Sequence, residues 1–336
     1  MTPKAVIFGC SGLRLTADER RFFAQHNPFG LILLGRNVDN PVQLTNLVTE
    51  FRACVNRPDA PVLIDQEGGR VARLRPPHWP EYPAPARLGE LYSSDKVKGI
   101  AAAKLLGRLI GEDLSALGIT VNCTPVLDLA FEGANDVMGN RCLAADASTV
   151  VALARAICDG LRVAGVLPVI KHIPGHGRAT SDSHLTLPVV SASLEQLEQF
   201  DFVPFRALSD IPLAMTAHIL YPALDPENCA TLSTKIIQET IRTRIGFKGL
   251  LISDDITMKA IEDSKSVSAQ AVLAAGCDVV LECKGVFSEM QQVAHVVPAL
   301  TPHALQRWSA AKNWLSPLDL FDRRLAEAEF NQLMSA

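Results

Sequence analysis

The chain has 336 residues, of which 48% are hydrophobic and 20% are charged, and its formal net charge is −4. This composition supports a folded core and gives no basic field that would attract nucleic acid. The sequence also has no apolar stretch approaching the roughly 18 residues that a membrane span requires. We therefore expect neither nucleic acid nor a membrane among its partners.

The cysteines and the N-terminal residues both favour the cytoplasm. The eight cysteines are scattered, none forms a C-x-x-C pair, and most lie in apolar stretches, as is typical of buried, reduced thiols. Residues 1–8 lead directly into a predicted strand and lack the pattern of a secretory signal. We predict a cytoplasmic protein without structural disulfides.

Short apolar stretches of strand length alternate with longer segments of helical spacing along the chain. The predicted strands are Ala5–Phe8, Gly30–Leu34, Val62–Ile64, Thr120–Asn122, Leu167–Ile170, Leu213–Thr216, Gly249–Ile252 and Asp278–Leu281. The predicted helices are Asp18–Ala24, Val42–Cys54, Val97–Leu117, Ala147–Ala164, Leu194–Leu208, Lys235–Ile245, Val267–Ala275, Phe287–Val297 and Pro302–Trp314. Thr16 and Asn40-Pro41 provide caps for the first two helices.

Most of the predicted strands are continuous apolar runs, the pattern of parallel strands covered on both faces. Their alternation with helices predicts a single-domain (β/α)8 barrel over residues 1–336, with residues 317–336 as a C-terminal helical extension. A doubly wound sheet is the alternative fold, since a sequence does not show whether a sheet closes. Pro76–Pro85 is predicted to be a rigid loop after the third strand.

Polar residues follow five of the predicted strands. They are Asp65–Arg73 after the third, Asp128 and Arg141 after the fourth, Lys171–His184 after the fifth, His218 after the sixth and Ser253–Asp255 after the seventh. In a barrel these strand ends meet at one face, where barrel enzymes have their active sites. The sequence therefore predicts an active site on that rim.

The adjacent carboxylates Asp254 and Asp255 end the seventh strand. Because neighbouring side chains of a strand point to opposite faces, at most one of them is expected to face the site squarely. The other is expected to cap the following helix or to support the first, since aspartate is a good N-cap residue.

Asp182-x-His184 has the composition of a catalytic dyad, in which a carboxylate orients an imidazole that transfers protons. The alternative is an ordinary turn aspartate beside an exposed histidine. His172 and His176 nearby raise a third interpretation, a metal site, although Pro174 and Gly175 exclude a helical arrangement of these ligands.

Asp65, Arg70 and Arg73 are suited to hold a polar ligand, or to form a structural ion pair at a strand end. Gly68-Gly69 indicates a tight turn in which larger side chains would not fit. His218 on its own is better explained as a structural histidine.

Several of these segments together resemble family 3 glycoside hydrolases, and more narrowly the cytoplasmic β-N-acetylglucosaminidases of peptidoglycan recycling. The segments are Lys171–Gly177, Asp182–His184, Asp65–Arg73, Ser253–Met258, Met215–Pro226 and Ala230–Ser233. The resemblance departs at Leu143-Ala144, where relatives usually have Phe-Gly, but it keeps the preceding Arg141. Glu67 is typical of this branch, and the sequence assigns it no direct role.

The resemblance implies a retaining exo-enzyme that removes terminal β-linked N-acetylglucosamine (GlcNAc) from GlcNAc-1,6-anhydro-MurNAc and its peptides, without cofactor or metal. It implies Asp254 as the nucleophile and His184 as the general acid/base with Asp182 as its partner. It also implies that the sugar is bound by Asp65, Arg73, Arg141, Lys171 and His172. We expect a monomer whose partner is this small-molecule substrate.

Three alternatives remain at the level of the sequence. A phosphorylase on the same scaffold would release GlcNAc-1-phosphate. A metal-dependent barrel hydrolase would use His172, His176, His184 and His218. A binding protein without activity would need the nucleophile or the acid to be missing, and the sequence has candidates for both.

Overall fold

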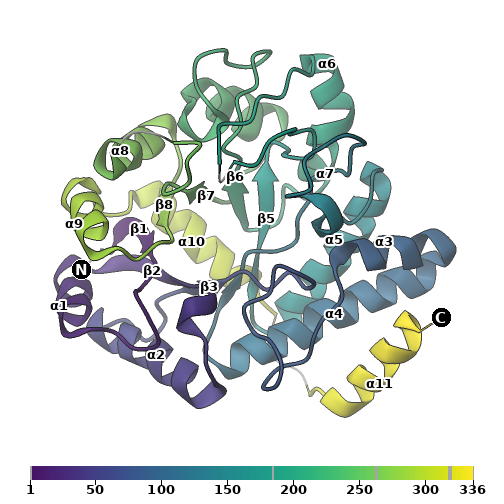
Figure 1. Cartoon of the computed structure of the whole chain (residues 1–336), viewed down its shortest axis with the longest axis horizontal. Helices are drawn as coiled ribbons and strands as arrows, with labels where there is room; N and C mark the ends of the chain where they lie inside the picture. The colour runs from purple at the N-terminus through teal and green to yellow at the C-terminus, as the bar shows by residue number, and fades with distance from the viewer. Residues whose placement is uncertain (1, 184, 262–263, 317–319, 336) are drawn as a thin grey trace.

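The computed structural model describes residues 2–183, 185–261, 264–316 and 320–335. Eight parallel strands form a closed barrel in the order of the sequence, so the last strand pairs with the first (Figure 1). The strands are β1 (Lys4–Phe8), β2 (Pro28–Leu33), β3 (Val62–Ile64), β4 (Val121–Asn122), β5 (Leu167–Ile173), β6 (Leu213–Thr216), β7 (Leu250–Asp255) and β8 (Val279–Glu282). The predicted (β/α)8 barrel is confirmed, and the doubly wound alternative is wrong.

Two strands are longer than their apolar runs indicate. β5 continues past Ile170 to Ile173, and β7 continues past Ile252 to Asp255. Lys171, His172 and Asp254 therefore lie on strands, although the sequence placed the first two in a loop after the strand. Because strand ends are fixed by hydrogen bonds to both neighbours, these side chains have better-defined directions than loop residues would have.

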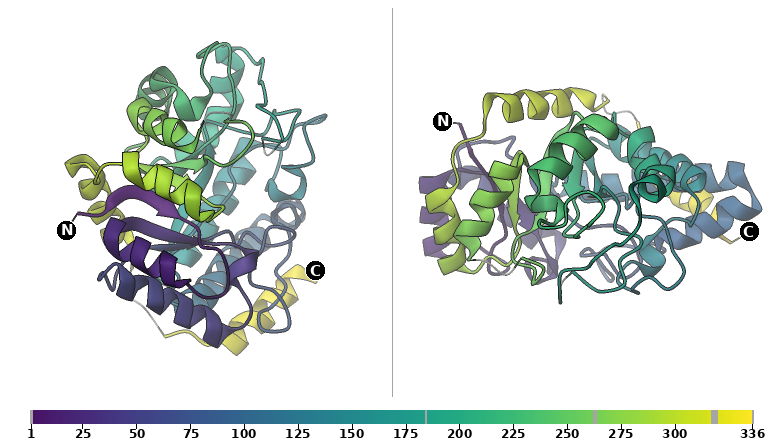
Figure 2. Two further views of the ribbon diagram at one scale, coloured as in Figure 1. Left: turned by 60° about the vertical axis from the view of Figure 1, so that its left-hand side comes forward. Right: turned by 90° about the horizontal axis from the view of Figure 1, so that it is seen from above.

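Helices surround the barrel on its outer side, as seen in both views of Figure 2. They are α1 (Ala17–His26), α2 (Pro41–Cys54), α3 (Pro85–Ser94), α4 (Lys96–Ala116), α5 (Ala147–Val163), α6 (Leu194–Gln196), α7 (Phe202–Ala207), α8 (Lys265–Ala275), α9 (Phe287–Val296), α10 (Pro302–Trp314) and α11 (Arg323–Met334). Short 3₁₀ or π turns complete the list: η1 (Gly35–Asn37), η2 (Gly139–Arg141), η3 (Leu197–Asp201), η4 (Ala230–Leu232) and η5 (Ile236–Arg244).

The predicted helix caps are present. Thr16 forms a capping box with Glu19 at the start of α1, and the Asn40 side chain accepts a hydrogen bond from Gln43 N at the start of α2. Helix α3 was not predicted, because its first residue, Pro85, ends the proline-rich stretch. Proline is well suited to the first position of a helix, where its missing N–H costs nothing.

The C-terminal helix α11 packs against α4 (Figure 1). Arg323 at its start forms an ion pair with Asp113 of α4, with 2.6 Å between Nη1 and Oδ1. Tyr82 donates a hydrogen bond to the other oxygen of the same carboxylate at 2.6 Å. Helix α11 is thus tied to the loop that leads from β3 to α3. Of the predicted C-terminal extension, residues 317–319 and 336 lie outside the described residues.

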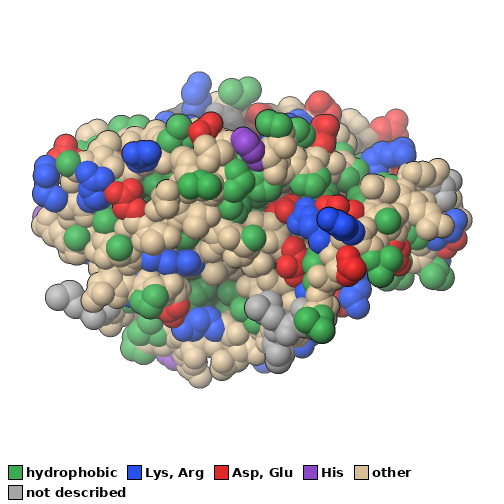
Figure 3. Space-filling view, turned by 90° about the horizontal axis from the view of Figure 1, so that it is seen from below, with side chains coloured by type: hydrophobic (Ala, Val, Ile, Leu, Met, Phe, Trp, Pro, Cys, Tyr) green, Lys and Arg blue, Asp and Glu red, His purple; other side chains and the backbone are tan. Residues whose placement is uncertain are grey.

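No described helix is long and apolar enough to cross a membrane. On the face shown in Figure 3, acidic and basic side chains lie next to one another rather than in separate fields.

Helices α4 and α5 approach closely at Gly160. A Cβ atom on Gly160 would lie 2.2 Å from Lys104 O and 2.6 Å from Arg108 N, both of which are backbone atoms of α4. Alanine normally stabilises a helix relative to glycine by about 1 kcal/mol. Here we expect Gly160→Ala to destabilise the protein by about 1–3 kcal/mol, because the two helices must move apart.

Urea unfolding of Gly160→Ala and of Gly35→Ala measures this difference. No atom lies within 4 Å of a Cβ placed on Gly35, so that variant is the control and its unfolding midpoint should stay close to wild type. A midpoint for Gly160→Ala equal to that of the control would contradict the expected clash.

Candidate active site

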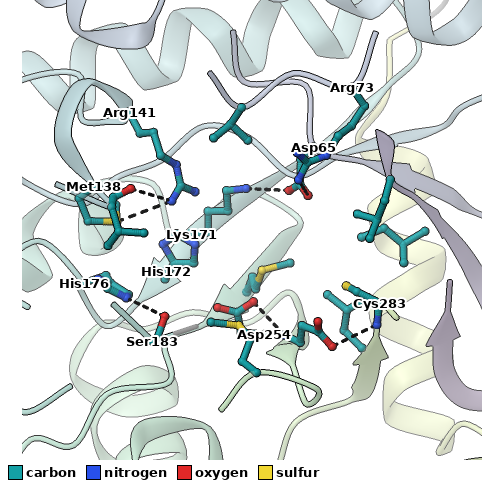
Figure 4. Close-up of a pocket in the computed structure, with 18 of the residues that line it drawn as sticks. Asp65, Arg73, Met138, Arg141, Lys171, His172, His176, Ser183, Asp254 and Cys283 are labelled. Atoms are coloured by element: carbon teal, nitrogen blue, oxygen red, sulfur yellow. Dashed lines mark hydrogen bonds and ion pairs between the residues drawn. The ribbon is translucent and has the colours of Figure 1, made fainter. Parts of the chain in front are cut away.

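A cavity of about 460 Å³ opens at the carboxyl ends of the strands. Six of the predicted site residues line it (Figure 4), and they are Asp65, Arg73, Arg141, Lys171, His172 and Asp254. Its remaining lining includes the apolar side chains of Ile32, Leu34, Met215, Met258 and Leu281. Asp182 is not among the lining residues, although its neighbour Ser183 is, and His184 lies outside the described residues.

One wall of the cavity is built on an ion-pair network. Lys171 Nζ lies 3.0 Å from Asp65 Oδ1 and 2.7 Å from Glu67 Oε1. Arg141 binds the same Glu67 carboxylate with two nitrogen atoms, Nε at 2.9 Å and Nη2 at 2.8 Å. Arg73 Nη2 donates to Asp65 Oδ2 at 3.0 Å. Three cations and two carboxylates therefore share one cluster, of which Glu67, Lys171 and Arg141 are buried.

The ion pairs keep the carboxylates of this cluster charged. Burial by itself would raise the pKa of Asp65, but Lys171 and Arg73 hold it well below its ordinary value. Burial opposes ionisation of Glu67 in the same way, yet Lys171 and Arg141 lower its pKa to about 2. The wall thus presents fixed N–H donors and a carboxylate acceptor, which suit the hydroxyl groups of a polar, uncharged ligand.

A tight hairpin holds this network in place. Gly68 has a φ of 104°, and a Cβ atom there would lie 2.3 Å from Pro83 O, so the predicted intolerance of bulk at Gly68-Gly69 is confirmed. The Gln66 side chain accepts hydrogen bonds from Arg73 N at 2.8 Å and Leu74 N at 3.0 Å. Gln66 therefore closes the loop that carries Asp65 and Arg73.

Asp128 fixes the orientation of His172. Its Oδ2 lies 2.8 Å from His172 Nδ1, and the carboxylate also accepts from the backbone N–H groups of His172 and His176. Because an ionised carboxylate only accepts, His172 Nδ1 carries a proton, and Nε2 is left for the cavity. Burial would raise the pKa of Asp128, but His172 keeps it below its ordinary value.

His176 contacts the segment that carries the predicted dyad. Its Nε2 atom lies 3.4 Å from Ser183 Oγ, between Asp182 and His184 in sequence. Burial and the neighbouring His172 lower the pKa of His176 to about 4, so its imidazole is neutral near pH 7. Ser183 O also accepts a hydrogen bond from Ala260 N at 3.2 Å, which attaches this segment to the loop after β7.

Asp254 lies across the cavity from the cationic wall (Figure 4). One of its oxygen atoms, Oδ1, accepts a hydrogen bond from Asp255 N at 2.8 Å. Burial would raise the pKa of Asp254, but His218, His172 and the Asp255 N–H hold it below its ordinary value. Asp254 is therefore an ionised carboxylate facing the ligand space.

The carboxylate of Asp255 is bound by groups of the protein itself. Its side chain accepts from Thr257 N at 2.9 Å, from Thr257 Oγ1 at 2.5 Å and from Cys283 N at 3.1 Å. It thus caps the turn after β7 and joins it to β8, as expected for the second carboxylate, although it also contributes to the cavity lining.

His218 is a structural histidine, as the sequence indicated. Its Nδ1 lies 2.7 Å from Thr231 Oγ1, and its Nε2 lies 3.0 Å from Asp255 O. Both ring nitrogens of His218 therefore have hydrogen-bond partners within the protein. Within the described ranges, no group of three or more His, Cys, Asp or Glu side chains is arranged to hold a metal ion.

Sequence reasoning did not assign roles to Glu67 and Asp128. Both side chains are fully buried at 0% exposure and bind residues that line the cavity. In the sequence, both residues follow a predicted strand within six positions, and Glu67 is also typical of the family that the sequence resembles. Their partners are 44 to 104 positions away, so the pairing itself was not visible.

We expect this network to make the protein acid-labile. Glu67 has an ordinary pKa of 4.5 and a pKa of about 2 in the folded protein, so between these values the unfolded chain binds more protons. Its contribution to stability is complete above pH 4.5 and is lost as the pH falls through 2. Urea unfolding from pH 7 to pH 3 should show the stability gap between wild type and Glu67→Gln narrowing as the pH falls. A gap that is constant over this range would contradict the assignment.

Comparison with known protein families gives one match across most of the chain. Residues 6–310 match the family model described as Glycosyl hydrolase family 3 N terminal domain. A beta-hexosaminidase from Alkalilimnicola ehrlichii is 39% identical over 282 residues, which cover 83% of this chain and 80% of the relative. A beta-hexosaminidase from Chromobacterium violaceum is 36% identical over 338 residues, which cover 98% of this chain and 94% of the relative.

A solved structure is similar over the full length. NagZ from Neisseria gonorrhoeae, in complex with N-trifluoroacetyl-D-glucosamine, has a TM-score of 0.86 and 32% sequence identity to this chain. The similarity covers 100% of this chain and 97% of the Neisseria protein.

Proposed function

Because this chain belongs to glycosyl hydrolase family 3, a family of glycoside hydrolases, we propose that it is a retaining exo-β-N-acetylglucosaminidase with Asp254 as its nucleophile. The observation that carries the proposal is the position of Asp254, an ionised carboxylate across the cavity from Lys171, Asp65 and Arg141. A sugar held by its hydroxyl groups on that wall presents its anomeric carbon to the carboxylate opposite.

The first step forms a covalent intermediate. Asp254 attacks the anomeric carbon, while His184 gives its proton to the glycosidic oxygen of the leaving group. In the second step His184 takes a proton from water, the water oxygen attacks the same carbon, and the Asp254 ester bond breaks. Two displacements at one carbon retain its configuration.

Asp182 serves His184 by fixing its tautomer and stabilising its charged form. Support for this dyad comes from Ser183, the residue between the two, which lines the same cavity as Asp254. An imidazole with an ordinary pKa near 6.5 suits proton transfer in both directions at neutral pH.

We further propose terminal β-linked GlcNAc as the sugar, and GlcNAc-1,6-anhydro-MurNAc and its peptides as the cytoplasmic substrates. The relatives named beta-hexosaminidase and the glucosamine derivative bound by the Neisseria protein support the sugar. Arg73, Arg141 and His172 complete the set of residues proposed to bind it.

The test of the mechanism is mass spectrometry after reaction with a 5-fluoro-β-GlcNAc glycoside, which slows the second step. We expect one glycosyl adduct, on the peptide containing Asp254, and none on Asp254→Ala. An adduct on another residue, or a product of inverted configuration, would overturn the proposal. Product analysis in phosphate buffer separates hydrolysis, which gives GlcNAc, from phosphorolysis, which gives GlcNAc-1-phosphate.

His184→Ala is expected to affect substrates according to their leaving groups. General acid catalysis contributes about 10²–10⁴-fold, and a poor leaving group needs the proton most. We expect the loss in kcat/KM to be near the top of this range for a methyl β-GlcNAc glycoside and far smaller for a 4-nitrophenyl glycoside. Equal losses on both substrates would exclude His184 as the acid.

A further inference from the structure

Glu67 is a fully buried carboxylate behind the wall of the cavity. Its side chain has 0% exposure, and it is not among the residues that line the cavity. It nevertheless contacts two residues that do line it, Arg141 and Lys171. These two come from different elements, η2 after β4 and strand β5.

We propose that Glu67 is a positioning residue that sets the direction and charge of Arg141 and Lys171, so that their free N–H groups meet the hydroxyl groups of the sugar. This inference rests on the proposed function, because it assigns Glu67 a part in binding that function's substrate. Glu67 itself touches neither the substrate nor the reacting atoms.

The geometry leaves a defined set of donors for a ligand. An ammonium group has three N–H donors; Lys171 donates one to Asp65 at 3.0 Å and lies 2.7 Å from Glu67 Oε1 in an ion pair, which leaves donor capacity for a ligand. Glu67 binds Arg141 side-on through Nε and Nη2, which fixes the plane of the guanidinium group. The Nη1 atom of Arg141 has longer contacts, 3.4 Å to Val137 O and 3.8 Å to Met138 Sδ.

The carboxylate is itself held rigidly. Glu67 N donates to Val71 O at 2.9 Å, and the next residue, Gly68, lies against Pro83 O. Gly69 N donates to Tyr82 O at 2.9 Å. Since backbone hydrogen bonds hold the segment on both sides of Glu67, its side chain can act as a fixed reference point for two other elements.

The charge balance of the ion-pair network depends on Glu67. Asp65 and Glu67 together face the three cations Lys171, Arg73 and Arg141. Despite burial, Asp65 and Glu67 raise the pKa of Lys171 above its ordinary value. Without the Glu67 charge, three cations would face one carboxylate, and Lys171 would lose its proton at a lower pH.

Glu67→Gln tests the proposal because it removes the charge and keeps the size of the side chain. We expect KM for a chromogenic β-GlcNAc glycoside to rise about 10–100-fold, with a smaller change in kcat, since the lost contacts serve binding.

Asp278→Asn is the matched control. Asp278 is also a buried carboxylate with two arginine partners, Arg242 at 2.9 Å and Arg307 at 2.6 Å, but it precedes β8 at the opposite end of the barrel. The Asp278→Asn protein should lose stability while its KM stays at the wild-type value. If Glu67→Gln behaves like Asp278→Asn, with lower stability only, Glu67 has a structural role and the proposal fails.

A second variant covers the case in which Glu67→Gln does not fold. Glu67→Asp keeps the charge but shortens the side chain by one methylene group, so its carboxylate cannot reach Arg141 and Lys171 in the same geometry and we expect a raised KM. A wild-type KM for Glu67→Asp would also overturn the proposal.

Failure of the proposed function would be visible separately, as absence of hydrolysis by the wild-type protein. Calorimetry with GlcNAc would then still compare wild type, Glu67→Gln and Asp278→Asn. Weaker GlcNAc binding by Glu67→Gln alone supports the positioning role, and equal binding by all three proteins contradicts it.

Discussion

Asp254→Ala is expected to reduce hydrolysis of β-GlcNAc glycosides at least about 10⁴-fold, because the other carboxylates that line the cavity among the described residues, Asp65 and Asp255, are bound within the protein. The loss should fall on kcat rather than on KM, since the cationic wall that is proposed to hold the sugar is unchanged. Steady-state kinetics with a 4-nitrophenyl glycoside measures both constants.

A small anion gives this prediction a second test. Alanine leaves space where the carboxylate was, so added azide should restore turnover of an activated glycoside and give the α-glycosyl azide. Asp255→Asn is the control, since the Asp255 carboxylate binds Thr257 and Cys283 N, and this variant should retain turnover without azide. If Asp254→Ala kept the wild-type rate, or if Asp255→Asn alone lost all activity, Asp254 would not be the nucleophile. Asp255 would then be the candidate.

Lys171→Met is expected to have the second largest effect and to act on both stability and activity. It leaves the carboxylates of Asp65 and the fully buried Glu67 without the ammonium group between them. Removing one partner of a buried ion pair costs about 3–5 kcal/mol. We expect a loss of this size in urea unfolding, together with a loss of at least about 100-fold in kcat/KM, equivalent to about 3 kcal/mol.

Lys4→Met is the control that separates the effect on stability from the effect on activity. Lys4 Nζ donates to the carbonyl oxygens of Ala294 and Val297, outside the cavity. This control should lose stability and keep its kcat/KM. A stable Lys171→Met protein with unchanged kcat/KM would contradict the role assigned to the ion-pair network.

The barrel could be predicted because its apolar strands alternate with amphipathic helices, and because burial on both faces leaves a plain pattern in each strand. Strand ends were less predictable. The apolar runs stop at Ile170 and Ile252, whereas β5 and β7 continue into charged residues. The partner of Lys171 on this extension is Asp65, which follows β3, two strands away, so no local pattern indicates it.

The candidate site was predicted as a set of residues and not as an arrangement. Motif resemblance identified Asp254 and Lys171, and the structure brings both to one cavity. It did not assign roles to Glu67 or Asp128, because a buried carboxylate acquires its role from partners distant in the sequence. Local sequence also did not reveal that Arg323 reaches the loop before α3.

Closure of the barrel has a consequence for synthesis on the ribosome. β1 pairs with β8 through the register Val6–Val280, Ile7–Leu281 and Phe8–Glu282. The first strand emerges early, but one of its edges has no partner until nearly the whole chain has been translated. A nascent or truncated chain that stops before β8 therefore exposes an apolar strand edge, which makes it a target for chaperones and for aggregation.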